Sequence, residues 1–185
     1  SPRCCAYSDS TRHAMRSALA PFGSDGAVRV IVESPRHSTL KYEYDPALDA
    51  IRVARQLSLG LAYPYDWGFV PGTRAEDGDP ADALVLHSTA TYPGVLLDCM
   101  PLGLITVRER QKRKWISNHR LVLRPAWKGA TPGVDKIGAL PRATVRELEQ
   151  FFVNAAFFTG KEMSVTGWRG PRDAVEFVRR CADEA

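Results

Sequence analysis

The pattern of hydrophobic and polar positions changes once along the chain. From residue 28 to residue 123, β-branched and aromatic residues occur in short runs that Gly, Pro or polar clusters interrupt, which is typical of β-strands. The runs predict strands over residues 28–33, 41–44, 51–55, 83–86, 95–101, 104–107 and 119–123. Many short strands that follow one another closely favour a small β-barrel.

The spacing becomes helical after Pro141. Apolar side chains recur there every three or four positions, and Pro141 suits the first turn of a helix. The residues that carry this spacing are Val145, Leu148, Phe151, Phe152 and Ala155. A second helix is predicted after Pro171, with a buried stripe made of Ala174, Val175, Val178 and Cys181. The fold class that we expect is therefore mainly β, with helices at the C-terminal end.

Length and composition add a domain division and a charge. A chain of 185 residues, 44% of them hydrophobic, can bury one sizeable core, which we assign to residues 27–185. Residues 1–26 are predicted to form a basic, flexible arm, because Arg3, Arg12 and Arg16 face one acid over residues 1–21. That bias fits a trimmed targeting sequence for the mitochondrial or another organelle matrix, or a disordered arm of a cytoplasmic protein. The net charge of +4 favours anionic partners, and no apolar run is long enough to span a membrane.

Three carboxylates fall within six residues, at Asp77, Asp79 and Asp82. Gly78 allows a tight turn between them, and Pro80 stiffens it. Like charges this close need solvent or a cation to separate them, and Mg²⁺ prefers oxygen ligands and phosphates. Taken alone, the segment fits either a solvated acidic turn, with a loosely held Ca²⁺, or a Mg²⁺ site that also takes substrate phosphates.

The segment before the acidic loop makes the pattern specific. Residues 63–73 read Tyr-Pro-Tyr-Asp-Trp-Gly-Phe-Val-Pro-Gly-Thr, and residues 76–82 read Glu-Asp-Gly-Asp-Pro-Ala-Asp. Together they closely resemble the signature of the family I, or soluble, inorganic pyrophosphatases. The resemblance extends from about residue 28 to residue 180. It implies a five-stranded, OB-like closed β-barrel flanked by C-terminal helices.

The resemblance also implies a role for each charged residue of the pattern. Asp77 and Asp82 would ligate activating Mg²⁺ ions, with Glu33 and Glu109 as further metal-binding residues, and Asp79 would help to deprotonate the attacking water. The groups that would hold the phosphates and complete the hydrogen-bond shell are Lys41, Arg55, Tyr63 and Glu43. Metal ions suit this chemistry because pyrophosphate is a polyanion whose charge must be neutralised during hydrolysis.

The pattern breaks where the family's second acidic segment is expected. That segment should carry two adjacent acids followed by Asp-x-Lys, and here it aligns with residues 108–116, of which only Glu109 keeps an acid. The positions expected for the second acid, the shared metal ligand and a phosphate-binding Lys fall at Arg110, Lys114 and Ile116. Further departures replace a Tyr-Lys pair that binds product phosphate by Ala155 and Ala156, and an active-site Tyr by Trp67.

A Lys side chain in place of a carboxylate ligand would repel a divalent ion about 4 Å away even after screening. We therefore predict an impaired or inactive pyrophosphatase-like protein, with one weak Mg²⁺ site or none. It would serve as a noncatalytic subunit, with protein subunits of a larger, mitochondrial assembly as its partners. The alternative is an active Mg²⁺-dependent enzyme that hydrolyses pyrophosphate to two phosphates.

The basic run at residues 108–114 adds a further alternative. It fits a contact surface for acidic protein, lipid headgroups or RNA, or simply a solvated loop. A nucleic-acid-binding barrel is the third functional hypothesis. It lacks support from the aromatic side chains, because no ladder for stacking bases is identifiable.

Overall fold

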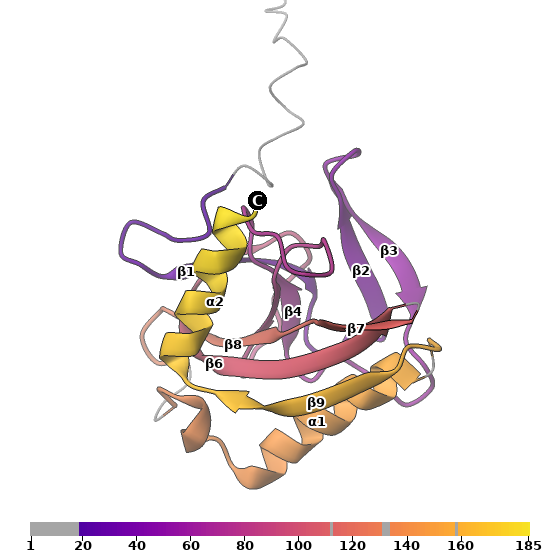
Figure 1. The fold of residues 1–185 in the computed structure, drawn as a ribbon. Helices are drawn as coiled ribbons and strands as arrows, with labels where there is room; N and C mark the ends of the chain where they lie inside the picture. The colour runs from indigo at the N-terminus through magenta and orange to yellow at the C-terminus, as the bar shows by residue number, and fades with distance from the viewer. Residues whose placement is uncertain (1–18, 112, 131–133, 158) are drawn as a thin grey trace, which may run out of the picture.

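The computed structural model describes residues 19–111, 113–130, 134–157 and 159–185. Its strands are β1 (Val28–Ser34), β2 (Leu40–Asp45), β3 (Ala50–Gln56), β4 (Asp66–Phe69), β5 (Asp82–Val85), β6 (Leu96–Gln111), β7 (Lys114–Ser117), β8 (Arg120–Pro125) and β9 (Met163–Arg169). Its helices are η1 (Ile137–Ala139, a 3₁₀ turn), α1 (Arg142–Phe157) and α2 (Pro171–Asp183). Strands thus occupy most of the first two thirds, and both long helices belong to the C-terminal third, as the sequence predicted (Figure 1).

Five strands form a ring in the order β1, β4, β5, β8 and β6. The ring is completed by the length of β6, which pairs with β8 along one stretch and with β1 along another. Within the ring only β5 and β8 run parallel, with Asp82 opposite Arg120. This arrangement confirms the predicted fold class, a mainly β protein with an OB-like five-stranded barrel and C-terminal helices.

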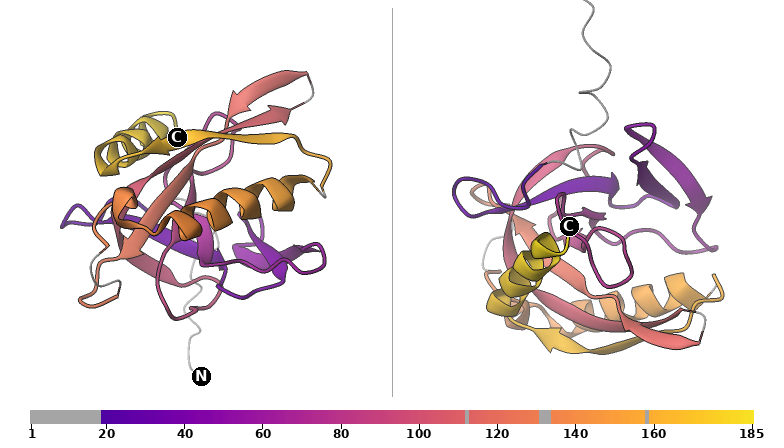
Figure 2. Two further views of the ribbon diagram at one scale, coloured as in Figure 1. Left: turned by 90° about the horizontal axis from the view of Figure 1, so that it is seen from below. Right: turned by 45° about the horizontal axis from the view of Figure 1, so that its top comes forward.

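Four strands and both long helices lie outside the ring. β7 and β9 pair with β6, whereas β2 and β3 form a separate two-stranded sheet. α1 runs along β9, and α2 packs against β6 (Figure 2). Trp168 on β9 donates a hydrogen bond from Nε1 to Oε1 of Glu149 on α1 at 2.6 Å. This bond fixes the position of the helix along the strand.

The strand predictions failed in two ways. Residues 95–101 and 104–107 were predicted as separate strands, but both belong to β6, which bends at an irregularity between Pro101 and Gly103 and does not end there. The strands β4, β7 and β9 were not predicted. In β4 all four residues are buried, so no alternation of polar and apolar positions marks it.

Two packed clusters fill the barrel and the space under the helices. Val30 and Leu121 belong to a cluster that includes Phe177 of α2, and Ile105 belongs to one that includes Leu148 of α1. The predicted stripes are confirmed in part: Leu148, Phe152, Ala174, Val178 and Cys181 are buried, whereas Ala156 and Phe177 are buried positions that were not predicted. Among the described helices, none combines the length and the apolar character needed to cross a membrane.

Asp66 is a fully buried carboxylate that ties three segments together. It accepts hydrogen bonds from the backbone N of Arg36 at 2.7 Å, from Oγ1 of Thr91 at 2.6 Å and from Nε2 of His87 at 2.9 Å. Burial alone would raise the pKa of Asp66, but these hydrogen bonds outweigh it and lower the pKa. The loops after β1 and β5 are thereby fastened to the start of β4.

The residues just before β1 lie against the barrel. Phe22 packs on the core and forms an isolated β-bridge with Val28, and the carbonyl of Pro21 accepts a hydrogen bond from the N of Arg29 at 2.9 Å. Residues 1–18 of the predicted basic arm lie outside the described residues, so their flexibility stays a prediction.

Replacing Gly68 by Ala should strongly destabilise the protein. A Cβ atom at this position of β4 would lie 2.0 Å from the carbonyl oxygen of Ile31 and 2.9 Å from Cα of Val32, so β1 and β4 would have to separate. We expect the free energy of unfolding, measured with urea, to fall by about 3 kcal/mol or more. The control is Gly138→Ala, whose Cβ has no described atom within 4 Å and which should cost less than about 0.5 kcal/mol. Equal effects of the two changes would contradict the close approach of β1 and β4.

Candidate active site

One cavity of about 950 Å³ collects the acidic loop and the groups that face it. Its walls come from the loop before β5, the β2–β3 hairpin, β6, the start of β8 and the end of α1. All the residues predicted for catalysis or metal binding line it: Glu33, Lys41, Glu43, Arg55, Tyr63, Asp77, Asp79, Asp82 and Glu109. The fold therefore brings together the groups that the sequence pattern singled out.

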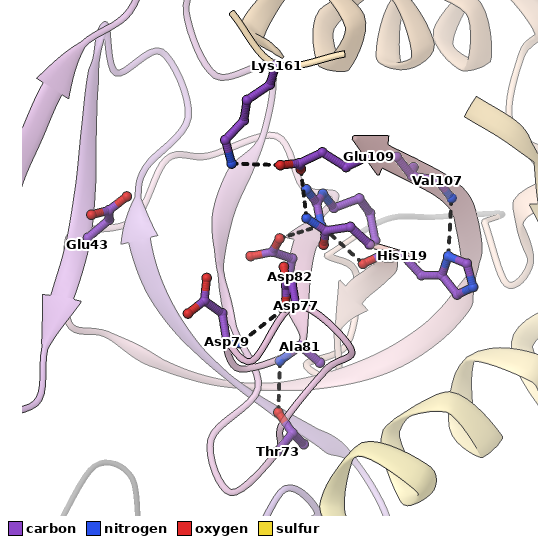
Figure 3. A network of polar contacts seen from close by, with 12 residues as sticks. Glu43, Thr73, Asp77, Asp79, Ala81, Asp82, Val107, Glu109, His119 and Lys161 are labelled. Atoms are coloured by element: carbon purple, nitrogen blue, oxygen red, sulfur yellow. Dashed lines mark hydrogen bonds and ion pairs between the residues drawn. The ribbon is translucent and has the colours of Figure 1, made fainter. Parts of the chain in front are cut away.

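Local hydrogen bonds hold the acidic loop in shape. Oδ1 of Asp77 accepts from the backbone N of Asp79 at 3.1 Å, and Oγ1 of Thr73 accepts from the N of Ala81 at 3.0 Å. Gly78 has a φ of 94°, a left-handed conformation that glycine adopts without strain. The carboxylates of Asp77 and Asp79 consequently lie on the same side of the loop, toward the interior of the cavity (Figure 3).

Glu109 on β6 forms the opposite wall, and its carboxylate already has partners. Its side chain is buried, Nζ of Lys161 lies 2.8 Å from Oε1, and Nδ2 of Asn118 donates to Oε2 at 2.9 Å. Burial alone would raise the pKa of Glu109, but the ion pair with Lys161 and the hydrogen bond from Asn118 outweigh it and lower the pKa. Glu109 is therefore an ionised group whose two oxygens are both engaged (Figure 3).

Arg120 places a positive charge between the two walls. Its Nη1 lies 2.5 Å from Oδ2 of Asp82 and also donates to Oδ1 of Asn118. The guanidinium lies over the ring of Trp67, 5.4 Å from the centroid, and only 7% of the side chain is exposed. A buried guanidinium with this many partners is a fixed part of the pocket.

Burial raises the pKa values of two of the carboxyl groups. Burial is the main cause that raises the pKa of Glu33 to about 7, against the hydrogen bond that its Oε1 accepts from the N of Tyr44 at 2.7 Å. Burial likewise raises the pKa of Asp82 to about 6, with Arg120 opposing the shift and Asp77 adding to it. In the metal-free protein both groups therefore bind protons in a pH range where exposed carboxyls are ionised.

The groups expected to hold phosphate lie on the β2–β3 hairpin and next to it. Lys41 and Arg55 are partners across the hairpin, and Lys41 forms an ion pair with Glu43. Tyr63 is buried, and burial raises the pKa of its phenol to about 12. Its hydroxyl thus stays protonated near neutral pH and can donate a hydrogen bond to an anion.

Three of the replaced family positions predicted within residues 108–116 lie away from the cavity, whereas Glu109 of the same stretch lines it. β6 and β7 form a hairpin in which Arg110 pairs with Trp115 and Glu109 with Ile116, and none of the residues Arg110, Lys114 and Ile116 lines the cavity. Arg110 instead forms an ion pair outside the cavity, with Glu162 at 3.0 Å.

Asn118 and Arg120 occupy the wall that was assigned to Lys114 and Ile116. They are two residues apart, and both line the cavity whereas His119 does not. His119 instead accepts a hydrogen bond on Nδ1 from the N of Val107 (Figure 3). The spacing Asn-x-Arg is the signal that could have located them, because it repeats the expected Asp-x-Lys spacing beyond the hairpin. Lys161 was part of the sequence resemblance, but no role had been predicted for it.

An apolar wall covers the end of the cavity next to α1. Trp67, Ala155 and Ala156, which we had interpreted as replaced family positions, line this end. The ring of Trp67 lies 5.7 Å from that of Phe152 and 6.2 Å from that of Tyr63. This wall provides shape and excludes water, but the two Ala side chains cannot bind phosphate.

The side chains present fit a divalent ion at the acidic loop and not at the Glu109 wall. Asp77 and Asp79 point carboxylates into the cavity, and among the described residues neither forms an ion pair. Carboxylate oxygens of this kind are the ligands that Mg²⁺ prefers. At the other wall both oxygens of Glu109 are taken by Lys161 and Asn118. As the described side chains stand, no group of three or more His, Cys, Asp or Glu residues is arranged as a metal site.

Known proteins are similar to this chain in both sequence and fold. The inorganic pyrophosphatase of Thermus thermophilus is 36% identical over 157 residues, which are 83% of this chain and 87% of that protein, and the enzyme of Aeropyrum pernix is 32% identical over 159 residues, 84% and 88%. The crystal structure of the Thermus thermophilus enzyme superposes with a TM-score of 0.84 at 34% identity over 91% of this chain and 97% of that one. That of the Helicobacter pylori enzyme gives 0.82 at 26% identity over 90% and 98%. The family model described as inorganic pyrophosphatase matches residues 30–185, so this chain belongs to the inorganic pyrophosphatase family.

Proposed function

We propose that this protein hydrolyses pyrophosphate to two phosphates, with Mg²⁺ as cofactor. The observation that carries the proposal is one cavity in which the acidic loop faces Lys41, Arg55 and the protonated hydroxyl of Tyr63. Curated relatives at 36% and 32% identity are inorganic pyrophosphatases, a family that depends on Mg²⁺. Cations on one side and carboxylates on the other are what a polyanionic substrate and its hydrolysis require.

The hairpin side of the cavity would bind the substrate. Lys41 and Arg55 provide charge for the phosphate oxygens, and Tyr63 provides a neutral donor. Because Glu43 already pairs with Lys41, a phosphate would have to compete for that ammonium or share it. Arg55 donates to the carbonyl of Gln56 at 3.4 Å, which is a long hydrogen bond that a phosphate oxygen could replace.

The acidic loop would hold the cation and accept the proton. Asp77 and Asp79 would bind Mg²⁺, which when bound supplies positive charge to the phosphates and acidifies water. Asp79 is exposed on the loop and has no ionic partner among the described residues, so besides binding the cation it would accept a proton from the attacking water. Asp82 is less free, because Arg120 is bound to it.

The noncatalytic subunit predicted from the sequence loses one of its arguments. Lys114 was expected to face the acidic loop, and it lies on β7 outside the cavity. The missing acid stays an argument, because no Asp occurs between Asp98 and Asp135. The replacements that do line the cavity, Asn118, Arg120, Ala155 and Ala156, support a pocket with weaker metal and product binding. Protein partners and an organelle matrix location stay predictions.

Release of phosphate from pyrophosphate tests the proposal directly. With Mg²⁺ at millimolar concentration, the purified protein should turn over at a rate in the ordinary enzyme range, about 1–10³ per second. Asp79→Asn should lower kcat by about 10²-fold or more, because it removes the proton acceptor and keeps the size of the side chain. Asp98→Asn makes the same charge change at an exposed site outside the cavity and should leave kcat unchanged. If the wild-type protein releases no phosphate, the noncatalytic hypothesis is favoured and this proposal fails.

Stability of the metal-free protein should fall as pH rises. The folded protein holds a proton on Glu33 up to about pH 7, whereas the unfolded chain releases it near 4.5, so folding is favoured at low pH and loses this contribution between the two values. In EDTA, the melting temperature should therefore decrease from about pH 5 to about pH 8. Glu33→Gln cannot ionise and can still accept the hydrogen bond from Tyr44, so its decrease should be smaller.

Glu162→Gln is the control for this pH dependence. Glu162 is exposed and pairs with Arg110 outside the cavity, so the variant should keep the wild-type decrease. An unchanged slope in Glu33→Gln would show that burial of Glu33 does not cause the effect. Part of the slope should persist in that variant, because burial raises the pKa of Asp82 as well.

A further inference from the structure

At the Glu109 wall, the carboxylate that would have to bind a metal ion is already paired with a cation of the protein itself, Lys161. Nζ of Lys161 lies 2.8 Å from Oε1 of Glu109, and Nδ2 of Asn118 lies 2.9 Å from Oε2. Asn118 is itself buried, and its amide oxygen accepts from Arg120. The amide is therefore oriented, with its nitrogen toward Glu109 and its oxygen toward the guanidinium, so a metal ion would have to share that oxygen with a cation.

Arg120 brings a second cation to the other side of the same wall. It contacts Asp82 and Asn118, and β8 holds its backbone directly opposite Asp82 of β5. Its side chain is 7% exposed, so water screens its charge poorly. A divalent ion within about 4 Å of this guanidinium would be repelled.

Around the acidic loop and the Glu109 wall, the charges of the described side chains leave room for one divalent ion. Four carboxylates lie around its acidic part, on Asp77, Asp79, Asp82 and Glu109, and two cations lie among them, on Arg120 and Lys161. The remaining two negative charges match the charge of a single Mg²⁺. They belong to the carboxylates that have no ion pair among the described residues, Asp77 and Asp79.

We propose that Arg120 and Lys161 are built-in cations that take the place of a divalent ion at the Glu109 wall, so that the substrate-free protein binds one divalent ion, at Asp77 and Asp79. The inference rests on the proposed function for the identity of the cofactor, but ion binding is measured without turnover. Arg120 is the firmer of the two cations, because the side chain of Lys161 is 57% exposed and its ion pair with Glu109 is partly solvated.

Titration of the full chain with Mn²⁺ tests this proposal. Electron paramagnetic resonance counts free Mn²⁺, and calorimetry gives the number bound; both should report one ion per chain in the absence of substrate. Lys161→Gln releases Oε1 of Glu109 and should admit a second ion, or tighten total Mn²⁺ binding about tenfold, equal to about 1.4 kcal/mol. The double variant Arg120→Gln with Lys161→Gln should increase binding further.

Arg110→Gln is the matched control. It removes one positive charge from an exposed position on β6, next to Glu109 in sequence but outside the cavity, and should leave the number of bound ions at one. Circular dichroism checks that each variant is folded. If the double variant does not fold, Lys161→Gln alone decides, because Lys161 is largely exposed.

Two results would overturn the inference: two or more Mn²⁺ ions bound per wild-type chain with similar affinity, or a folded Lys161→Gln variant that binds Mn²⁺ as the wild type does. Failure of the proposed function looks different. A wild-type protein that binds one Mn²⁺ and releases no phosphate would refute hydrolysis and support the built-in cations.

Discussion

The ion pair between Arg120 and Asp82 is the interaction on which the pocket depends. It is a direct product of the strand arrangement, because β5 and β8 run parallel with these two residues opposite each other. Asn118, two residues earlier, then meets Glu109 on β6, which is antiparallel to β8. Removing one partner would leave an unpaired charge inside the protein. Such a change lowers the free energy of unfolding far more than replacing both partners by apolar residues would. A shift in the pairing of β5 with β8 would therefore also separate the charges that line the cavity.

A guanidinium and a metal ion neutralise carboxylates in different ways. A metal ion must be captured from solution, so its charge is present only to the extent that it is bound. Arg120 has no such equilibrium, since its charge is covalently attached and persists at every accessible pH. A guanidinium cannot, however, acidify a water molecule by coordinating it. The acidic half of the pocket, with Asp77 and Asp79, would then carry all of that chemistry, and Arg120 would contribute charge alone.

The sequence predicted most of this pocket because the long motif over residues 63–82 fixes the positions of its parts. Every residue assigned from that motif and from the strands before it lines the cavity. The assignment failed after Glu109, where counting residues cannot reveal that the chain makes a hairpin and returns. Only the pairing of β6 with β7 shows that Lys114 has left the wall and that Asn118 has entered it.

Two of the three unpredicted strands, β4 and β9, were missed for related reasons. Hydrophobic periodicity marks a strand with one buried face, and β4 is buried on both. β9 alternates between intermediate and exposed positions, and its partner β6 is distant in sequence. Pairing between distant segments is a property of the folded chain, which no local pattern encodes.

The substrate-binding cations do not belong to the ring. Lys41 and Arg55 lie on a two-stranded sheet of their own, and such a hairpin is only marginally stable by itself. The hairpin is attached to the ring by hydrogen bonds from the N of Tyr42 to Oγ of Ser34 at 2.9 Å and from the N of Tyr44 to Oε1 of Glu33 at 2.7 Å, and by the ring of Tyr44, which stacks on that of Phe69. The carboxylates of the acidic loop and of Glu109 therefore belong to the ring strands and the loop before β5, whereas Lys41 and Arg55 lie on a separate sheet attached to the ring. One of these hydrogen bonds ends on the carboxyl group of Glu33 at the cavity wall, so protonation of Glu33 changes the strength of one link between the phosphate-binding hairpin and the ring.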